Sequence, residues 1–134
     1  MISARTKGRL AEHAAAAITT LGGYRVIARN FAIPGGEIDI IAQKRSTLAI
    51  IEVRLRGGSA FADGLESVDI PKQQRILRAA EHFIARHPSY TFHKIRFDVL
   101  SFGERDYAPH LIPTIRWTRN AFNSDALPEL QNNF

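Results

Sequence analysis

The sequence predicts an α/β protein in which a small mixed sheet lies between helices, in the order helix, three strands, helix, strand. Apolar residues recur at helical spacing in two segments, and β-branched runs lie between and after them. A strand–helix–strand connection late in the chain would place the last core strand parallel to an earlier one. The glycine motifs of doubly wound nucleotide-binding folds and of P-loops are absent from the sequence, which excludes those classes.

The first helix is predicted over residues 7–21 and is ended by Gly22-Gly23. One face carries apolar residues at helical spacing, and we expect it to meet the core: Leu10, Ala14, Ala17, Ile18 and Leu21. Glu12 lies on another face of this helix. Its neighbours there are small and would permit close approach of a strand or a substrate: Gly8, Ala15 and Thr19.

Three strands are predicted next, as an antiparallel meander. Tyr24–Phe31 alternates in polarity and is followed by a Pro-Gly-Gly turn. Glu37–Gln43 and Leu48–Arg54 are rich in β-branched residues. The polar residues 44–47 join these two runs, which is typical of a hairpin.

The glycine-containing stretch 55–68 predicts a long mobile loop. A second helix is predicted from Asp69 to about His87. Asp69 can accept hydrogen bonds as N-cap, Pro71 suits the first turn, and Pro88 would stop the helix.

Ile95–Phe102 predicts a fourth strand, and Ile112–Thr118 has a weaker pattern of the same kind. We expect residues 123–134 to be a loosely held polar tail. Residues 1–122 would then form a single domain.

The composition excludes several classes of function. The 134 residues contain no cysteine, which rules out a disulfide scaffold, a thiolate zinc site, an iron–sulfur cluster and a cysteine nucleophile. Apolar runs fall well short of the ~20 residues of a membrane helix, and a secretory signal is lacking. We therefore expect a cytoplasmic protein without a membrane partner.

The formal charge of +5 is unevenly distributed. Residues 1–30 and 71–96 are basic, and the carboxylates between them cluster around Glu37, Asp39 and Glu52. Such an excess can serve solubility alone. It also suits a phosphate backbone, because clustered Lys and Arg release counterions on binding one.

Two of these carboxylates can meet across the predicted hairpin. If Gln43 pairs with Leu48 across a four-residue loop, Asp39 lies directly opposite Glu52. A loop shorter by one residue would instead place them on opposite faces of the sheet. Cross-strand Cβ atoms are only ~4.5–5.5 Å apart, and like charges so placed are destabilising.

A pair of this kind requires a cation or a proton between its members. Oxygen ligands favour a hard divalent ion, and Mg²⁺ is the expected cofactor. The alternative is that Asp39 and Glu52 simply face solvent on a half-exposed hairpin. Both residues lie within apolar runs, where an unpaired charge is costly, and this setting favours a functional pair.

Short motifs in a fixed order, spread over about residues 7–122, resemble those of the small uncharacterised bacterial YraN-type family. The N-terminal motifs are Lys7-Gly8-Arg9 with Glu12, Gly23-Tyr24, Ala28-Arg29-Asn30-Phe31 and Gly35-Gly36-Glu37-Ile38-Asp39. The later motifs are Ile51-Glu52-Val53, Lys72-Gln73, Arg96-Phe97-Asp98-Val99 and Asn120-Ala121-Phe122.

That family resembles the restriction-endonuclease-like PD-(D/E)XK superfamily, and within it the archaeal Holliday-junction resolvases. The resemblance implies an αβββαβ core with a small mixed sheet sandwiched by helices. It implies that Asp39 and Glu52 are metal ligands, with the Val53 carbonyl as a third. It further implies that Glu12 corresponds to the acidic residue on the first helix of the resolvases.

The chain departs from the superfamily pattern at Arg54, where a lysine is expected two residues after the glutamate. Arginine keeps its charge and can grip a phosphate with two hydrogen bonds, but it cannot act as a base. With the hairpin register above, Arg54 would lie opposite Glu37. Binding of phosphate and metal would therefore survive the change better than catalysis.

Lys72 can supply a relocated lysine from the start of the second helix, although helix lysines are more often simply exposed. Gln73 beside it could contact phosphate or metal-bound water. Arg75 and Arg86 share a helical stripe with Lys72 and could follow a nucleic-acid backbone, or could be only a solvated face. Arg56, in the glycine-flanked loop, could close on the same backbone.

Other polar groups have structural roles in this interpretation. The five histidines lack metal-ligand spacing, and the nucleophile elbow of serine hydrolases is absent from the sequence. Arg96 and Asp98 are expected to form a structural ion pair. Tyr24, Phe97 and Trp117 are expected in the core.

The sequence thus predicts a nucleic-acid-binding protein of nuclease-like fold, with DNA favoured over RNA. Catalysis would be that of a Mg²⁺-dependent endonuclease on structured or branched DNA, its site weakened or altered by Arg54. A homodimer is conceivable by analogy with resolvases. The alternative is a catalytically inactive protein-interaction module on a nuclease scaffold.

Overall fold

A five-stranded mixed sheet forms the centre of the molecule. The computed structural model describes residues 4–56, 68–103 and 114–134. The strand order is β1-β2-β3-β4-β5, with β3 and β4 parallel and the other neighbours antiparallel. The principal elements are α1 (Ala4–Leu21), β1 (Arg25–Ile33), β2 (Gly36–Lys44), β3 (Thr47–Arg56), α2 (Ile70–Arg86), β4 (Lys94–Gly103) and β5 (Thr114–Phe122).

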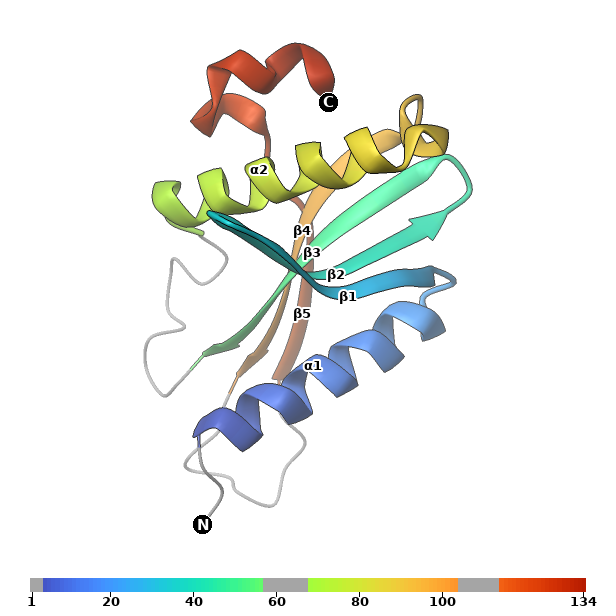
Figure 1. The fold of residues 1–134 in the computed structure, drawn as a ribbon. Coiled ribbons are helices and arrows are strands. Elements are labelled where there is room, and N and C mark those ends of the chain that lie inside the picture. Colours follow the sequence, from blue (N-terminus) through green and yellow to red (C-terminus); the bar gives the residue numbers. More distant parts are fainter. Residues whose placement is uncertain (1–3, 57–67, 104–113) are drawn as a thin grey trace.

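The two helices cover opposite faces of this sheet, as Figure 1 shows. The larger core cluster lies between α2 and the sheet, and includes Ile38, Leu48, Ile50, Leu77 and Phe97. The other lies between α1 and the sheet, and includes Ala11, Ala15, Ile40, Ile51 and Leu100. We call them the α2-side and α1-side clusters. The predicted mixed sheet between helices is confirmed, and it is consistent with a restriction-endonuclease-like core.

The predicted elements agree with the observed ones to within a few residues. Most of the expected loop, residues 57–67, lies outside the described residues, but its first two positions belong to β3. The expected fifth strand begins in an undescribed stretch, and β5 continues past its predicted end to Phe122. Neither α1 nor α2, within the described chain, is long and apolar enough to cross a membrane.

The predicted core face of α1 is wrong in part, since Ala14 and Ile18 are half-buried against the α1-side cluster but the other members of that face are exposed. Leu10 and Leu21 are 53% and 86% exposed, and the buried face is the small one: Ala11, Ala15 and Thr19. The Thr19 hydroxyl donates to the Ala15 carbonyl at 2.7 Å, so its polar group is satisfied within the helix. Small side chains let the helix axis approach the sheet closely. The close packing of this small face is therefore favoured over a helix orientation that would bury Leu10 and Leu21.

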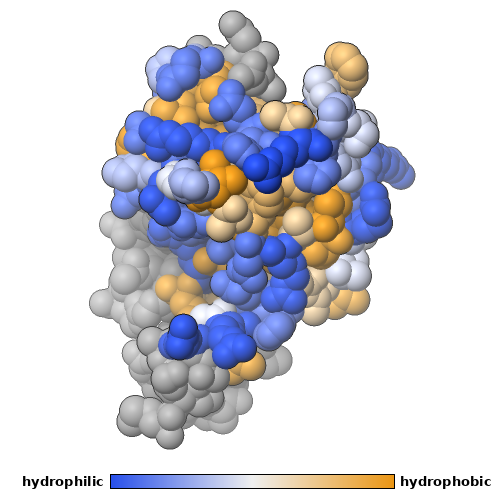
Figure 2. Space-filling view, in the orientation of Figure 1, coloured by the Kyte–Doolittle hydropathy of each residue, from blue (hydrophilic) through white to orange (hydrophobic). Residues whose placement is uncertain are grey.

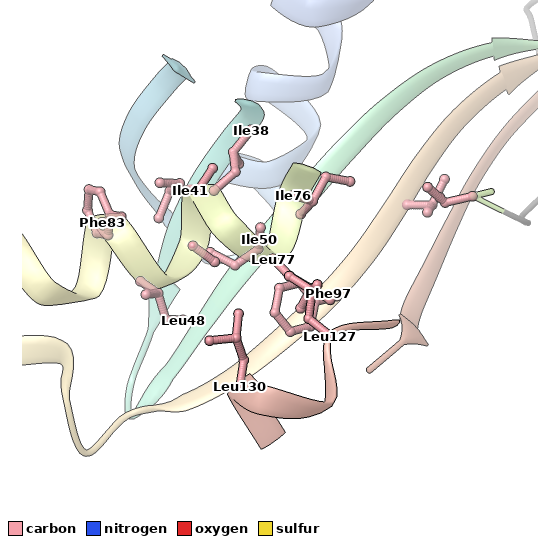
Figure 3. Close-up of a cluster of buried hydrophobic side chains, with 14 residues drawn as sticks. Ile38, Ile41, Leu48, Ile50, Ile76, Leu77, Phe83, Phe97, Leu127 and Leu130 are labelled. Carbon is pink, nitrogen blue, oxygen red and sulfur yellow. The ribbon is translucent and has the colours of Figure 1, made fainter. Parts of the chain in front are cut away.

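The segment after residue 122 is not loosely held. It forms two 3₁₀ turns, Ser124–Ala126 and Pro128–Asn133. Leu127 and Leu130 are each only 6% exposed and join the α2-side cluster near Phe97 (Figure 3). Their spacing of three matches the 3₁₀ repeat, which puts both side chains on one face.

Asp98 of β4 is a buried structural carboxylate that holds the edge strand β5. It accepts hydrogen bonds from the Arg96 guanidinium at 2.8 Å, the Trp117 indole at 3.0 Å and the Asn120 amide at 2.9 Å. The predicted Arg96–Asp98 pair is therefore confirmed. Tyr24 and Phe97 are buried as expected, whereas Trp117 is only half-buried.

Helix α2 lies unusually close to the beginning of β2. Asp69 caps the helix as predicted, accepting from the Lys72 amide at 2.9 Å. A Cβ atom on Gly36 would stand 2.5 Å from the Arg75 carbonyl oxygen. Only glycine permits this approach, which places the first turns of α2 over β2.

Replacing Gly36 by alanine should therefore destabilise the protein by about 1–3 kcal/mol, because the added methyl group meets backbone. Gly8→Ala is the matched control. A Cβ there has no atom within 4 Å, and alanine in a helix is favoured by about 0.5–1 kcal/mol. Measured by urea denaturation, the free energy of unfolding should thus fall in Gly36→Ala and rise in Gly8→Ala. A change in the same direction for both variants would contradict the close packing at Gly36.

Candidate functional site

The hairpin of β2 and β3 has the register that brings Asp39 and Glu52 together. Gln43 pairs with Leu48, and regular pairing continues to Ile40 and Ile51. Beyond that point the Asp39 carboxylate itself accepts a hydrogen bond from the Val53 amide, at 2.8 Å. The two strands separate there, and a side chain takes the place of the backbone partner.

Alternation along β2 breaks at Asp39. In a regular strand Ile38 and Ile40 would share a face of the sheet, but Ile38 belongs to the α2-side cluster and Ile40 to the α1-side cluster. In the neighbouring strand Asn30 has a φ of 53°, in the left-handed region. Such irregularities re-aim a side chain and are frequent beside functional sites.

The separated strands open into a pocket of about 250 Å³. Its lining comes from four elements: Gly8, Ala11 and Glu12 of α1, Asp39 of β2, Glu52, Val53 and Leu55 of β3, and Lys72 of α2. The structure thus brings together five of the predicted site residues: Glu12, Asp39, Glu52, Val53 and Lys72.

Glu52 is the most buried charged group in this pocket. Its side chain is 9% exposed, and its Oε1 has no hydrogen-bond partner among the described residues. Burial, followed by the charge of Asp39, raises the pKa of Glu52 to about 8. An unpartnered carboxylate oxygen next to a second carboxylate is costly unless a ligand occupies the pocket.

Two cations approach the other oxygen of Glu52. The Lys72 ammonium lies 3.8 Å and the Arg54 Nε 3.9 Å from Oε2. Burial alone would lower the pKa of Lys72, but the hydrogen bond to Glu37 and the nearby carboxylates outweigh it, and the pKa is raised. Lys72 is therefore a fixed positive charge at neutral pH, like the arginine.

Glu37 does not lie opposite Arg54, as the regular hairpin predicts. It instead accepts hydrogen bonds from Lys72 at 2.9 Å and from both ends of the Arg75 fork, at 3.0 and 2.8 Å. The hydrogen bonds from Arg75 and Lys72 lower the pKa of Glu37 to about 2. Sequence reasoning missed this role of Glu37. The one signal for it was that two basic residues, Lys72 and Arg75, lie one helix turn apart and can reach the same carboxylate.

The remaining predicted residues do not line the pocket. The Gln73 amide donates to the Val68 carbonyl at 2.7 Å and so supports the start of α2. Arg75 is engaged with Glu37, and Arg86 is exposed at the far end of the helix. The side chain of Arg56 lies outside the described residues.

The basic stripe predicted along α2 is interrupted. Ala79, which the helical spacing places on that stripe, is fully buried and belongs to the α2-side cluster. A Cβ on Gly36 would lie 3.2 Å from the Ala79 Cβ, so the helix face meets the sheet at this point. In the orientation of Figure 1, the surface in Figure 2 has hydrophilic side chains with hydrophobic areas between them.

The residues of the pocket fit a divalent cation in part. The described residues contain no group of three His, Cys, Asp or Glu that could hold a metal, so Glu12 does not complete a triad with Asp39 and Glu52. Mg²⁺, however, commonly binds through one or two carboxylates and keeps several waters. The unpartnered Oε1 of Glu52 is consistent with such an ion.

The mixed sheet with a helix on each face is that of an α/β protein and is consistent with a restriction-endonuclease-like core, with two carboxylates where two central strands separate. The chain belongs to uncharacterised protein family UPF0102, whose model matches residues 11–102. The resemblance to the YraN-type family is thereby confirmed.

Bacterial relatives match most of this chain. A UPF0102 protein of Alcanivorax borkumensis is 41% identical over 92% of this chain and 96% of its own length. A UPF0102 protein of Stutzerimonas stutzeri is 36% identical over 92% of this chain and 100% of its own length. A third, from Rhodopseudomonas palustris, is 41% identical over 83% of this chain and 84% of its own length. Their names state the family and no activity.

The raised pKa of Glu52 predicts a pH-dependent cost in stability. Between pH 4.5, the ordinary pKa of a glutamate, and about pH 8, the folded protein holds a proton that the unfolded chain releases, so stability falls as pH rises through this range. In EDTA, Glu52→Gln should be more stable than wild type above pH 8, by roughly 2–4 kcal/mol. The two should converge near pH 5.

Thermal or urea unfolding from pH 5 to pH 9 measures this difference directly. Glu129→Gln, at an exposed position in the C-terminal turn, is the matched control and should follow wild type at every pH. If the stability of wild type and of Glu52→Gln changed with pH in the same way, Glu52 would ionise in the folded protein without a loss of stability.

Proposed function

We propose that this protein is a metal-dependent phosphodiesterase acting on nucleic acid, with structured or branched DNA as the favoured substrate. The observation that carries the proposal is the buried Glu52, held beside Asp39 with one carboxylate oxygen unpartnered in an open pocket. A buried acidic pair whose ionisation is unfavourable is typical of a functional site rather than of a stabilising interaction.

Asp39 and Glu52 would hold the divalent ion, and Val53 lies at the same place on β3. When bound, such an ion supplies a Lewis acid for the phosphate and lowers the pKa of a coordinated water. The Val53 amide orients Asp39 through a 2.8 Å hydrogen bond, so one oxygen of that carboxylate is fixed by the backbone.

Lys72 and Arg54 would neutralise the charge that develops on the scissile phosphate. Both lie within 4 Å of the same Glu52 oxygen, and Lys72 also lines the pocket. Lys72 is thereby the cation best placed to take over from the lysine that the superfamily has at the position of Arg54. Neither side chain acts as a base, since both keep their positive charge.

Glu12 lies on the α1 wall of the pocket and is half-buried. In hydrolysis, a water oxygen bonds to phosphorus and the bond to the leaving ester oxygen breaks. Glu12 would accept one proton of that water, and solvent would protonate the leaving oxygen. This assignment separates the proton acceptor on α1 from the phosphate-binding cations on β3 and α2.

Asp39→Asn should lower Mg²⁺- or Mn²⁺-dependent cleavage of branched DNA by at least about a hundredfold, because a ligand carboxylate is lost. It should also abolish the rise in melting temperature that Mn²⁺ gives to wild type in the absence of DNA. Asp125→Asn, in the C-terminal 3₁₀ turn, is the control and should behave as wild type.

Salt-dependent DNA binding without cleavage by wild type would instead support a binding protein, which the replacement of the motif lysine by Arg54 also favours. Absence of both binding and cleavage at low salt would contradict the nucleic-acid proposal and leave the protein-interaction module.

The two cations can be ranked by substitution. Lys72→Met should lower cleavage by at least about a hundredfold, whereas Arg54→Lys should change it by less than about tenfold, since a positive charge stays beside Glu52. Lys94→Met, an exposed lysine at the start of β4, is the control. A large gain in Arg54→Lys together with normal activity in Lys72→Met would show that Lys72 has no part in the reaction.

A further inference from the structure

Glu37 stands outside the pocket lining but touches a residue inside it. We infer that Glu37 is a positioning residue, which holds the Lys72 ammonium group at the pocket rim and keeps it from closing onto Glu52. The inference rests on the proposed function, since it assigns how one of the phosphate-binding cations is placed.

The distances show which carboxylate controls Lys72. Its Nζ lies 2.9 Å from Glu37 Oε1, a full hydrogen bond, and 3.8 Å from Glu52 Oε2, beyond hydrogen-bond length. A lysine without Glu37 would be free to move toward Glu52, the more buried carboxylate. Glu37 therefore leaves the oxygens of Glu52 accessible to a bound ion and the ammonium directed at an incoming phosphate.

Glu37 is itself fixed on both of its oxygens. Arg75 donates from Nε to Oε1 at 3.0 Å and from Nη2 to Oε2 at 2.8 Å, the two-point geometry that restricts a carboxylate most strongly. Lys72 and Arg75 are three residues apart and so lie on one face of α2. Gly36 allows that face to approach β2 closely enough for both contacts.

Stability alone is a weak explanation for this arrangement. The side chains of Lys72, Glu37 and Arg75 are 27%, 35% and 44% exposed, and ion pairs of such exposure typically contribute about 0–1 kcal/mol. Lysine has a long flexible stem, whose placement matters far more to catalysis than to folding. A misplacement by about 1 Å can cost a reaction roughly a hundredfold.

The decisive experiment compares Glu37→Gln in two backgrounds. In the wild-type background it should lower kcat for Mg²⁺-dependent DNA cleavage by about ten- to a hundredfold with a smaller change in KM. In the Lys72→Met background it should cause no further loss, because Glu37 acts through Lys72. Glu129→Gln is the matched control for the isosteric change and should leave kcat unchanged.

A second measurement needs neither metal nor substrate. Reductive methylation followed by mass spectrometry reports the accessibility of each lysine in the folded protein. Lys72 should react several-fold more slowly in Glu37→Gln than in wild type, because its ammonium group then closes onto the buried Glu52, while Lys94 serves as an internal reference. Arg78→Met, one turn farther along α2 at an exposed position, should leave the reactivity of Lys72 unchanged.

Each outcome decides one of the two proposals. Equal losses of kcat in both backgrounds, or no loss in either, would overturn the positioning role, as would unchanged methylation of Lys72 in Glu37→Gln. If wild type does not cleave DNA, the phosphodiesterase proposal fails, and the methylation result still decides whether Glu37 holds Lys72.

Discussion

The hydrogen bond from the Val53 amide to the Asp39 carboxylate takes the place of a backbone contact between β2 and β3. It ends the regular pairing after Ile40 and Ile51 and opens the space in which Glu52 and Lys72 meet. The other features of the site depend on this opening. Helix α1 closes it from one side with small residues, and α2 closes it from the other with lysine.

Charge in this opening is arranged at the expense of stability. Glu52 is buried beside a second carboxylate, and its neighbouring cations remain 3.8–3.9 Å away rather than forming a close pair. The close pairs are made farther out, between Glu37 and α2. The fold thus satisfies its outer charges fully and leaves the inner carboxylates incompletely paired, which is the condition for binding a cation and a phosphate.

Local signals predicted much of the fold, and tertiary packing decided the rest. The polar residues 44–47 indicated the hairpin register, although Lys44 and Thr47 themselves pair and the turn is only two residues long. Asp69 with Pro71 indicated the start of α2. The face of α1 was mispredicted because periodicity weighs Leu10 above Ala11, whereas the sheet accepts only small side chains at that distance. Glu37 was missed because its partners come from a helix more than thirty residues later in the chain.

The topology also orders the assembly of the site during folding. Both carboxylates lie on one hairpin, whose contacts are local in sequence, whereas the parallel pairing of β3 with β4 joins Thr47 to Lys94 across the whole of α2. Local contacts form before distant ones, because closing a long loop costs more entropy. We therefore expect the acidic pair to be brought together in the nascent hairpin before Lys72 arrives to balance it. Protons from the solvent would then be its first counter-charge.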